Sequence, residues 1–186
     1  MADILPELMG LEEHVAVYAL VGMCVSEVAE IEWCLFQCLV LTSGLELPEA
    51  HASFTATQKF KDRRKLVDKA VRAWPKMPPE WIPEWEALVR RLQTLCGPNG
   101  VRNVVGHNPV RAGIWLTDPE ANPPNFLEVV TKWGVSQNAN DVMSGRRPLR
   151  DEDCGSMSGH VRDLRAGSLA IMKFWSRLVG VNQERG

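Results

Sequence analysis

Apolar residues recur every three to four positions through much of the chain, a pattern that predicts a mainly helical protein. The first such stretch runs from Leu11 to Leu41 and contains few helix-breaking residues. It is followed by Gly44, a residue type that readily adopts the left-handed conformation that closes many helices. We therefore expect one long helix over 11–41, longer than the typical helix of a globular protein.

Two further helices are predicted before residue 100. The second begins near Thr55, with Gln58 three residues further on as in a capping box, and it ends at Pro75. The third has Pro83 in its first turn and stops at Gly97, which is followed by another proline. Their apolar stripes comprise Phe60, Val67, Val71 and Trp74 in the second helix and Trp85, Leu88, Val89, Leu92, Leu95 and Cys96 in the third.

The periodicity changes after residue 109. Two short runs rich in β-branched and aromatic residues, Val110–Thr117 and Phe126–Trp133, flank a proline-containing stretch and predict a β-hairpin with a long tip. Residues 134–150 form a polar loop in this interpretation, and helical spacing then returns to the C-terminus. The apolar stripe of that last helix comprises Met157, Val161, Leu164, Ile171, Trp175 and Leu178. We expect a single domain over 1–186, built of about four long helices with the hairpin inserted before the last.

Composition narrows the class of protein. The chain has 186 residues, of which 45% are hydrophobic and 24% charged, as in an ordinary soluble globular domain. Its net charge of −2 argues against a surface that coats nucleic acid, although a small basic cleft remains compatible. Five scattered cysteines fit a reducing compartment better than a disulfide framework. The apolar run Val15–Val25 is too short to span a bilayer, and no secretory signal is evident, so we expect a cytoplasmic protein with no membrane partner.

The densest group of reactive side chains lies at Arg102-Asn103-Val104-Val105-Gly106-His107, within an otherwise apolar segment. In a helix, which turns about 100° per residue, Asn103 and His107 would share a face and the long Arg102 side chain could reach the same spot. A fixed cation, a carboxamide and an imidazole suit phosphodiester chemistry that uses no metal. The alternative is structural: Arg102 caps a helix end, Asn103 turns the chain and His107 bonds a buried carbonyl.

This segment resembles the R-x4-6-H motif of the HEPN superfamily, in the form with a polar Asn103 after the arginine. The first helix contains Ile31-Glu32 followed by Leu35, which is similar to the Ile-Glu-x-x-Leu pattern common in HEPN helices. The resemblance implies an antiparallel helical bundle and a ribonuclease with Arg102, Asn103 and His107 as catalytic residues. It further implies a homodimer with a composite site, and a toxin, a defence effector or an RNA-processing factor, sometimes silenced by an antitoxin or regulatory protein.

The expected activity is endoribonuclease cleavage by attack of the ribose 2′-hydroxyl, with no metal or other cofactor. The rival interpretation is a non-catalytic HEPN-like helical module that binds a protein partner through the hairpin and the region of Trp81. A third is nucleotide binding without turnover, through Arg102. Cys34 and Cys38 lie four residues apart, as metal ligands on a helix do, but no Cys-x-x-Cys pair or histidine cluster accompanies them, which favours core thiols.

Basic residues cluster on the second predicted helix, where they could follow an RNA backbone. Asp62 and Asp68 interrupt the cluster, and such runs are more often solvated faces. Lys59, Lys61 and Arg64 are the substrate-binding candidates. The whole cluster comprises Lys59, Lys61, Arg63, Arg64, Lys65 and Lys69.

Overall fold

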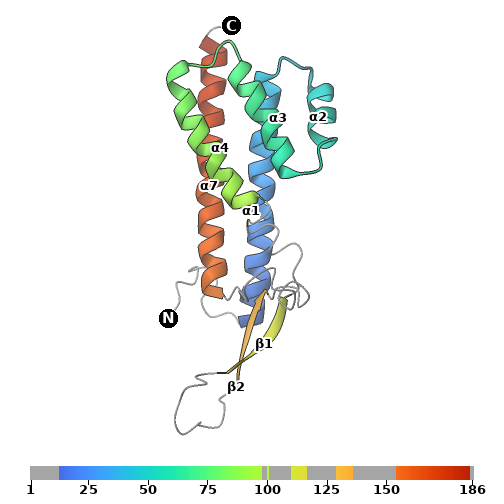
Figure 1. The fold of residues 1–186 in the computed structure, drawn as a ribbon, viewed down its shortest axis with the longest axis vertical. Helices are drawn as coiled ribbons and strands as arrows, with labels where there is room; N and C mark the ends of the chain where they lie inside the picture. The colour runs from blue at the N-terminus through green and yellow to red at the C-terminus, as the bar shows by residue number, and fades with distance from the viewer. Residues whose placement is uncertain (1–12, 98–99, 101–109, 117–128, 136–153, 185–186) are drawn as a thin grey trace. The chain divides into compact units, whose positions relative to one another are not determined.

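The computed structural model describes residues 13–97, 100, 110–116, 129–135 and 154–184, and these are mainly helical (Figure 1). The chain groups into two compact units, one comprising residues 1–24 and 104–161 and the other 25–103 and 162–186. The described helices are α1 (Glu13–Thr42), α2 (Leu47–Thr55), α3 (Phe60–Ala73), α4 (Ile82–Cys96) and α7 (Cys154–Glu184), with a 3-10 turn, η2 (Pro79–Trp81), before α4. No described helix is both long and apolar enough to cross a membrane.

Two strands, β1 (Val110–Leu116) and β2 (Val129–Val135), pair antiparallel with Gly113 opposite Lys132. The predicted hairpin tip lies outside the described residues, as does the polar loop that should follow the second strand. The hairpin as an insertion before the last helix therefore stays a prediction, and so does the single domain over 1–186.

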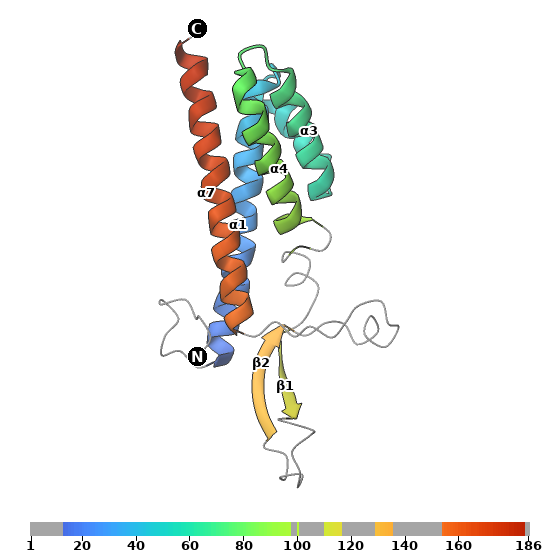
Figure 2. The same ribbon diagram turned by 60° about the vertical axis from the view of Figure 1, so that its left-hand side comes forward.

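Within the unit formed by residues 25–103 and 162–186, α4 runs opposite to α3 and α7, whereas α1 and α7 run in the same direction (Figures 1 and 2). Side-chain contacts agree with this arrangement of α3 and α4. Arg64, early in α3, bonds to Gln93 near the end of α4, and Arg72, late in α3, bonds to Glu86 near its start. The antiparallel bundle of four long helices stays a prediction.

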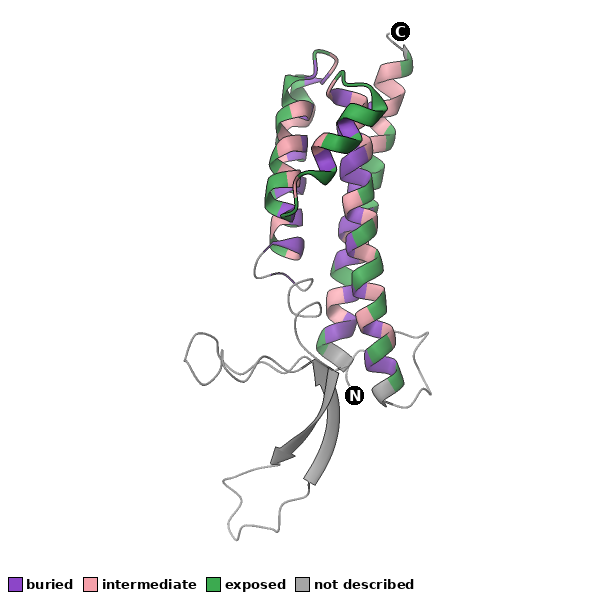
Figure 3. Ribbon diagram, turned by 90° about the vertical axis from the view of Figure 1, so that its right-hand side faces the viewer, coloured by how far each residue is buried: buried purple, intermediate pink, exposed green. Residues whose placement is uncertain are grey.

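Buried residues recur at helical intervals, coloured purple in Figure 3. In the second unit, α1 buries Ile31 and Leu35, which recur four residues apart on one face, as the apolar face of a helix does. Gly167 of α7 allows close packing, because a Cβ there would lie 2.8 Å from a methyl carbon of Leu95. The core of this unit also includes Val67, Val71, Trp85, Leu92, Leu164, Ile171, Phe174 and Leu178.

Several predicted element ends are confirmed. Helix α1 ends at Thr42, and Gly44 follows with a φ of +70°. Helix α3 ends at Ala73, just before the first of the prolines that were expected to stop it. Helix α4 has a proline in its first turn and ends at Cys96 with Gly97 as its C-cap. These ends follow from local backbone chemistry, because proline cannot continue a helix and glycine tolerates the conformations that close one.

The predicted start of the second helix near Thr55 is wrong. Thr55 is the last residue of α2, a helix that the periodicity did not reveal, and α3 begins five residues later with Lys59 as its N-cap. The Thr55 hydroxyl donates to the backbone oxygen of His51 at 2.8 Å, so it bonds back into α2 instead of capping a new helix. The short helix starts where it does because Pro48 stands in its first turn.

One predicted core position is shifted by a residue. Trp175 is only half-buried, and its neighbour Phe174 is buried between the rings of Trp81 and Trp85, with centroid distances of 6.2 and 5.0 Å. Both positions satisfy helical spacing from Ile171, three and four residues on, so periodicity alone could not separate them.

Candidate nucleic-acid interface

The predicted catalytic residues Arg102, Asn103 and His107 lie outside the described residues. The structure describes the segment that leads to them. Helix α4 ends at Cys96, six residues before Arg102. The predicted motif therefore does not continue α4.

The chain turns tightly where α4 ends. The Gly97 N–H donates to the backbone oxygen of Gln93 at 2.9 Å, and the Gly100 N–H donates to the Gly97 oxygen at 2.8 Å. A Cβ on Gly97 would collide with the backbone oxygen and the side-chain amide of Gln93, and one on Gly100 would collide with the Leu95 carbonyl. Both positions therefore require glycine, because no larger residue fits this close approach of backbone to backbone.

Arg64 lies beside this turn. Its Nε donates a 3.0 Å hydrogen bond to Oε1 of Gln93, and the Gln93 amide in turn packs against Gly97. Arg64 is half-buried, and its partner is neutral. Since a neutral amide leaves the guanidinium charge uncompensated, Arg64 holds a net cation beside the last turn of α4.

Lys61 and Lys65 extend this charge along α3. They stand three residues before and one residue after Arg64, so all three share one flank of the helix. Both lysines are exposed, and neither forms an ion pair within the part of the chain that the structure describes. Lys59, the remaining substrate-binding candidate, is exposed at the N-cap of α3.

Arg90 joins the same flank from α4. Glu86, Arg90 and Gln93 are spaced four and three residues apart, so they share a face of α4, and two of them bond to α3 side chains. The Arg90 side chain is 72% exposed, and its nearest acidic atom is Glu86 Oε2 at 3.8 Å. We call Lys61, Arg64, Lys65 and Arg90 the cationic edge. Sequence reasoning missed Arg90 and Gln93, although their spacing on α4 was a signal that could have found them.

Arg63, next in sequence to Arg64, has a different role. Its Nη1 pairs with Glu32 Oε2 of α1 at 2.7 Å, and its Nε donates to the backbone oxygen of Thr57 at 2.6 Å. The guanidinium also lies 5.2 Å from the ring centre of Phe54. Both members of the ion pair have side chains only 20% exposed. Arg63 therefore ties α3 to α1 and is not available to a ligand.

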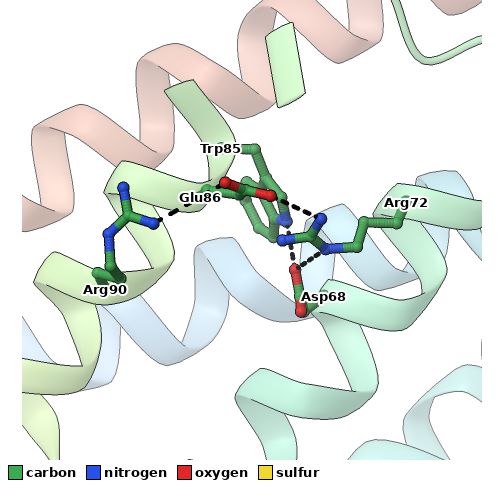
Figure 4. Close-up of polar contacts among 5 residues, drawn as sticks. All are labelled: Asp68, Arg72, Trp85, Glu86 and Arg90. Carbon is green, nitrogen blue, oxygen red and sulfur yellow. Dashed lines mark hydrogen bonds and ion pairs between the residues drawn. The ribbon is translucent and has the colours of Figure 1, made fainter. Parts of the chain in front are cut away.

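A second polar network joins α3 to α4 further along the two helices (Figure 4). Asp68 Oδ1 accepts 2.8 Å hydrogen bonds from the indole Nε1 of Trp85 and from the Nε of Arg72. Arg72 also bonds to Glu86 at 2.9 Å, and these two carboxylates raise the pKa of its guanidinium. Arg72 is thus neutralised by its neighbours, whereas Lys69, four residues after Lys65, is exposed and forms no ion pair among the described residues.

Cys34 and Cys38, the two cysteines of α1 that lie four residues apart, are in the core. Burial raises the pKa of the Cys34 thiol to about 11, helped by the negative charge of Glu30, whose Oε1 lies 3.8 Å from Sγ. Burial raises the pKa of Cys38 further still. Thiols held in the protonated form are poor metal ligands and poor nucleophiles. Within the described residues, no cluster of three or more histidine, cysteine or acidic side chains could hold a metal ion.

Trp81, which was expected to cover a surface or a partner, is itself covered within the chain. The guanidinium of Arg177 lies 4.0 Å from its ring centre, and Arg177 also bonds to both carboxylate oxygens of Glu84 at 2.6 and 2.7 Å. Through these contacts η2 and the start of α4 pack against α7.

Comparison with known proteins gives no relationship to build on. No protein-family model matches the chain, and no curated protein or solved structure matches it either.

Proposed function

We propose that the protein is a metal-independent endoribonuclease. The observation that carries the proposal is the sequence Arg102-Asn103-Val104-Val105-Gly106-His107, which begins six residues after α4 ends. It is supported by the uncompensated cation of Arg64, which is bonded to Gln93 in the last turn of α4. Arg64 would hold a polyanionic substrate beside that turn. The turn lies only a few residues, in sequence, from the groups proposed to act on the substrate.

The proposed reaction is a transesterification within the RNA strand. His107 accepts the proton of a ribose 2′-hydroxyl, and the 2′-oxygen forms a bond to the adjacent phosphorus. The bond from phosphorus to the 5′-oxygen breaks, and that oxygen takes up a proton. Arg102 stabilises the charge that builds on the phosphoryl oxygens, and Asn103 orients the imidazole or a phosphate oxygen. The products are a 2′,3′-cyclic phosphate and a free 5′-hydroxyl.

The proposal includes a homodimer. One histidine cannot easily both remove the proton of the nucleophile and protonate the leaving oxygen, so two copies of the motif across a two-fold axis would supply the acid and the base. The exposed cations Lys59 and Lys61, with Arg64, would bind the substrate. A cytoplasmic toxin or defence effector held in check by an antitoxin or regulatory protein is the biological setting proposed for such an enzyme.

A second candidate function is a non-catalytic helical module that binds a protein partner. It is favoured by large apolar side chains on the outside of two helices. Val25 and Trp33 of α1 are 53% and 55% exposed, and Leu169 of α7 is 53% exposed. Apolar surface of this kind, where it is contiguous, marks protein-protein contacts.

Expression in growing cells separates the two functions. The wild-type protein is expected to arrest growth and to degrade cellular RNA, and His107→Ala is expected to do neither at an equal protein level. His51→Ala provides the matched control, because His51 is an exposed histidine of α2 and should leave toxicity unchanged. Growth and intact RNA with all three proteins would favour the partner-binding module.

A further inference from the structure

We propose that the cationic edge is a track for the phosphodiester backbone of single-stranded nucleic acid, and that it reads neither the base nor the 2′-hydroxyl. This inference rests on the proposed function for its substrate class. It adds that binding and cleavage are performed by different residues with different chemical requirements.

The four cations lie on two neighbouring helices. Lys61 and Lys65 are one helical turn apart, about 6 Å along the axis of α3, and Arg64 lies between them on the same flank. Arg90 adds a cation from the neighbouring flank of α4, which is joined to α3 through Glu86 and Gln93. Four cations from two adjacent helices thus gather along one seam.

The charge of Arg64 has no carboxylate partner among the described residues. Two neighbouring arginines are held closely by carboxylates, Arg63 by Glu32 at 2.7 Å and Arg72 by Asp68 and Glu86 at 2.8 and 2.9 Å, whereas Arg90 forms only a 3.8 Å ion pair with Glu86. Arg64 is instead held by a neutral amide through its Nε, so its two terminal nitrogens can face a phosphate. Asp62 lies three residues before Lys65 and so neighbours it on the helix surface, but it forms no ion pair among the described residues.

The described parts of α3 and α4 present no exposed aromatic ring beside the cationic edge. The aromatic residues of α3 and α4 among the described residues are Phe60 and Trp85, and both are buried. Base stacking needs an exposed ring, and base-edge recognition needs donors and acceptors placed in a fixed pattern. Ammonium and guanidinium groups alone recognise phosphate, which RNA and DNA share. Four cations on a chain of net charge −2 are too few to coat a duplex and suit a short single strand.

The proposal separates the sugar requirement of binding from that of cleavage. Binding should be the same for single-stranded RNA and DNA of one sequence, whereas cleavage requires the 2′-hydroxyl. Affinity should also fall with salt, by a log-log slope of about −0.7 for each phosphate neutralised on a single strand.

The test measures binding to the full-length His107→Ala protein, which removes the proposed proton-transfer group. A labelled 12-nucleotide RNA, the DNA of the same sequence and the corresponding duplex are titrated by fluorescence anisotropy at several salt concentrations. The track variant is Lys61→Glu with Lys65→Glu. The control is Arg91→Glu with Lys173→Glu, which changes the net charge equally at exposed positions of α4 and α7 outside the edge.

We expect the track variant to bind at least tenfold more weakly than its parent, with a salt slope shallower by about 1.4, and the control to stay within about threefold. RNA and DNA single strands should bind within about threefold of each other, and both more tightly than the duplex. Equal losses in the track and control variants would overturn the proposal, because they would show a net-charge effect only. So would a tenfold preference for RNA over DNA, or binding of an acidic peptide in place of nucleic acid.

Measuring binding and cleavage separately distinguishes a failure of the proposed track from a failure of the proposed nuclease activity. If the track variant loses nucleic-acid binding but the wild-type protein cuts no RNA, the track stands and the proposed activity falls. If RNA is cut with an unchanged kcat/KM by the track variant, the activity stands and the track falls.

Discussion

The Nε of Arg64 donates a 3.0 Å hydrogen bond to Oε1 of Gln93, and this contact joins the first turns of α3 to the last turn of α4. The Gln93 amide also packs against Gly97, the residue that ends α4. The position of the Arg64 cation on α3 therefore depends on Gly97, the glycine that follows α4. The arrangement depends on the absence of a side chain at Gly97, which can be tested directly.

Replacing Gly97 with alanine should lower the free energy of unfolding by about 1–3 kcal/mol, because the new Cβ would collide with the backbone oxygen of Gln93. Gly180→Ala is the control. Gly180 lies within α7 and has no atom within 4 Å of the position of a Cβ, so alanine there should be neutral or stabilising by up to about 1 kcal/mol. Urea unfolding measures both, and a Gly97→Ala protein as stable as the wild type would contradict the packing described.

Removing Arg63 should be more damaging than removing Arg90. Arg63→Ala leaves Glu32 largely buried without its cation and should cost about 3 kcal/mol of unfolding free energy. Arg90 lies 3.8 Å from its acidic partner and is mostly exposed, so Arg90→Ala should cost less than about 0.5 kcal/mol. The double variant Glu32→Leu with Arg63→Leu should regain much of the loss. Equal effects of the two single variants would show that Arg63 is not structural.

Asp68 is expected to stabilise the protein chiefly through the indole of Trp85. Asp68→Ala leaves the buried Nε1–H without an acceptor and should lower the free energy of unfolding by about 1–3 kcal/mol. Asp68→Asn keeps an acceptor oxygen and should lose less. Chemical denaturation of the two variants provides the comparison. An asparagine variant no more stable than the alanine variant would indicate that the ion pair of Asp68 with Arg72 contributes more to stability than its hydrogen bond with Trp85.

The raised pKa of Cys34 predicts a loss of stability at alkaline pH. The folded state holds the thiol proton up to about pH 11, whereas the thiol of the unfolded chain ionises near its ordinary value of 9.0. This contribution to stability is complete below pH 9 and disappears as the pH rises toward 11. Cys34→Ala should show a shallower decline of unfolding free energy over that interval. Parallel pH profiles for the two proteins would mean that folding does not raise the pKa of the Cys34 thiol.

Local chemistry explains which parts of the fold could be predicted. The bounds of α4 were predictable because Pro83 marks its start and Gly97 its end, and the end of α1 was likewise predictable from Gly44. Helix α2 could not be predicted from periodicity. It has nine residues and buries only Ala50 and Phe54, too few positions to show a repeat.

The candidate interface was predictable only in outline. The basic run on α3 was visible in the sequence, but the different roles of Arg63 and Arg64 were not. Adjacent residues on a helix project about 100° apart, and which of them meets α1 depends on Glu32, distant in sequence. Gln93 carries no charge, so only its spacing from Glu86 and Arg90 on α4 could have indicated it. The predicted catalytic residues themselves lie outside the described part of the chain, so their roles stay a proposal.

The central claim is tested most directly by incubating purified protein with a panel of single-stranded RNAs in EDTA, beside a DNA of matching sequence. The wild-type protein is expected to cut RNA, leaving 2′,3′-cyclic phosphate ends, and to leave the DNA intact. Arg102→Ala and His107→Ala should each abolish cleavage while their helical content stays unchanged. Intact RNA with the wild-type protein, or cutting that persists in both variants, would contradict the proposal that this motif is a metal-independent ribonuclease site.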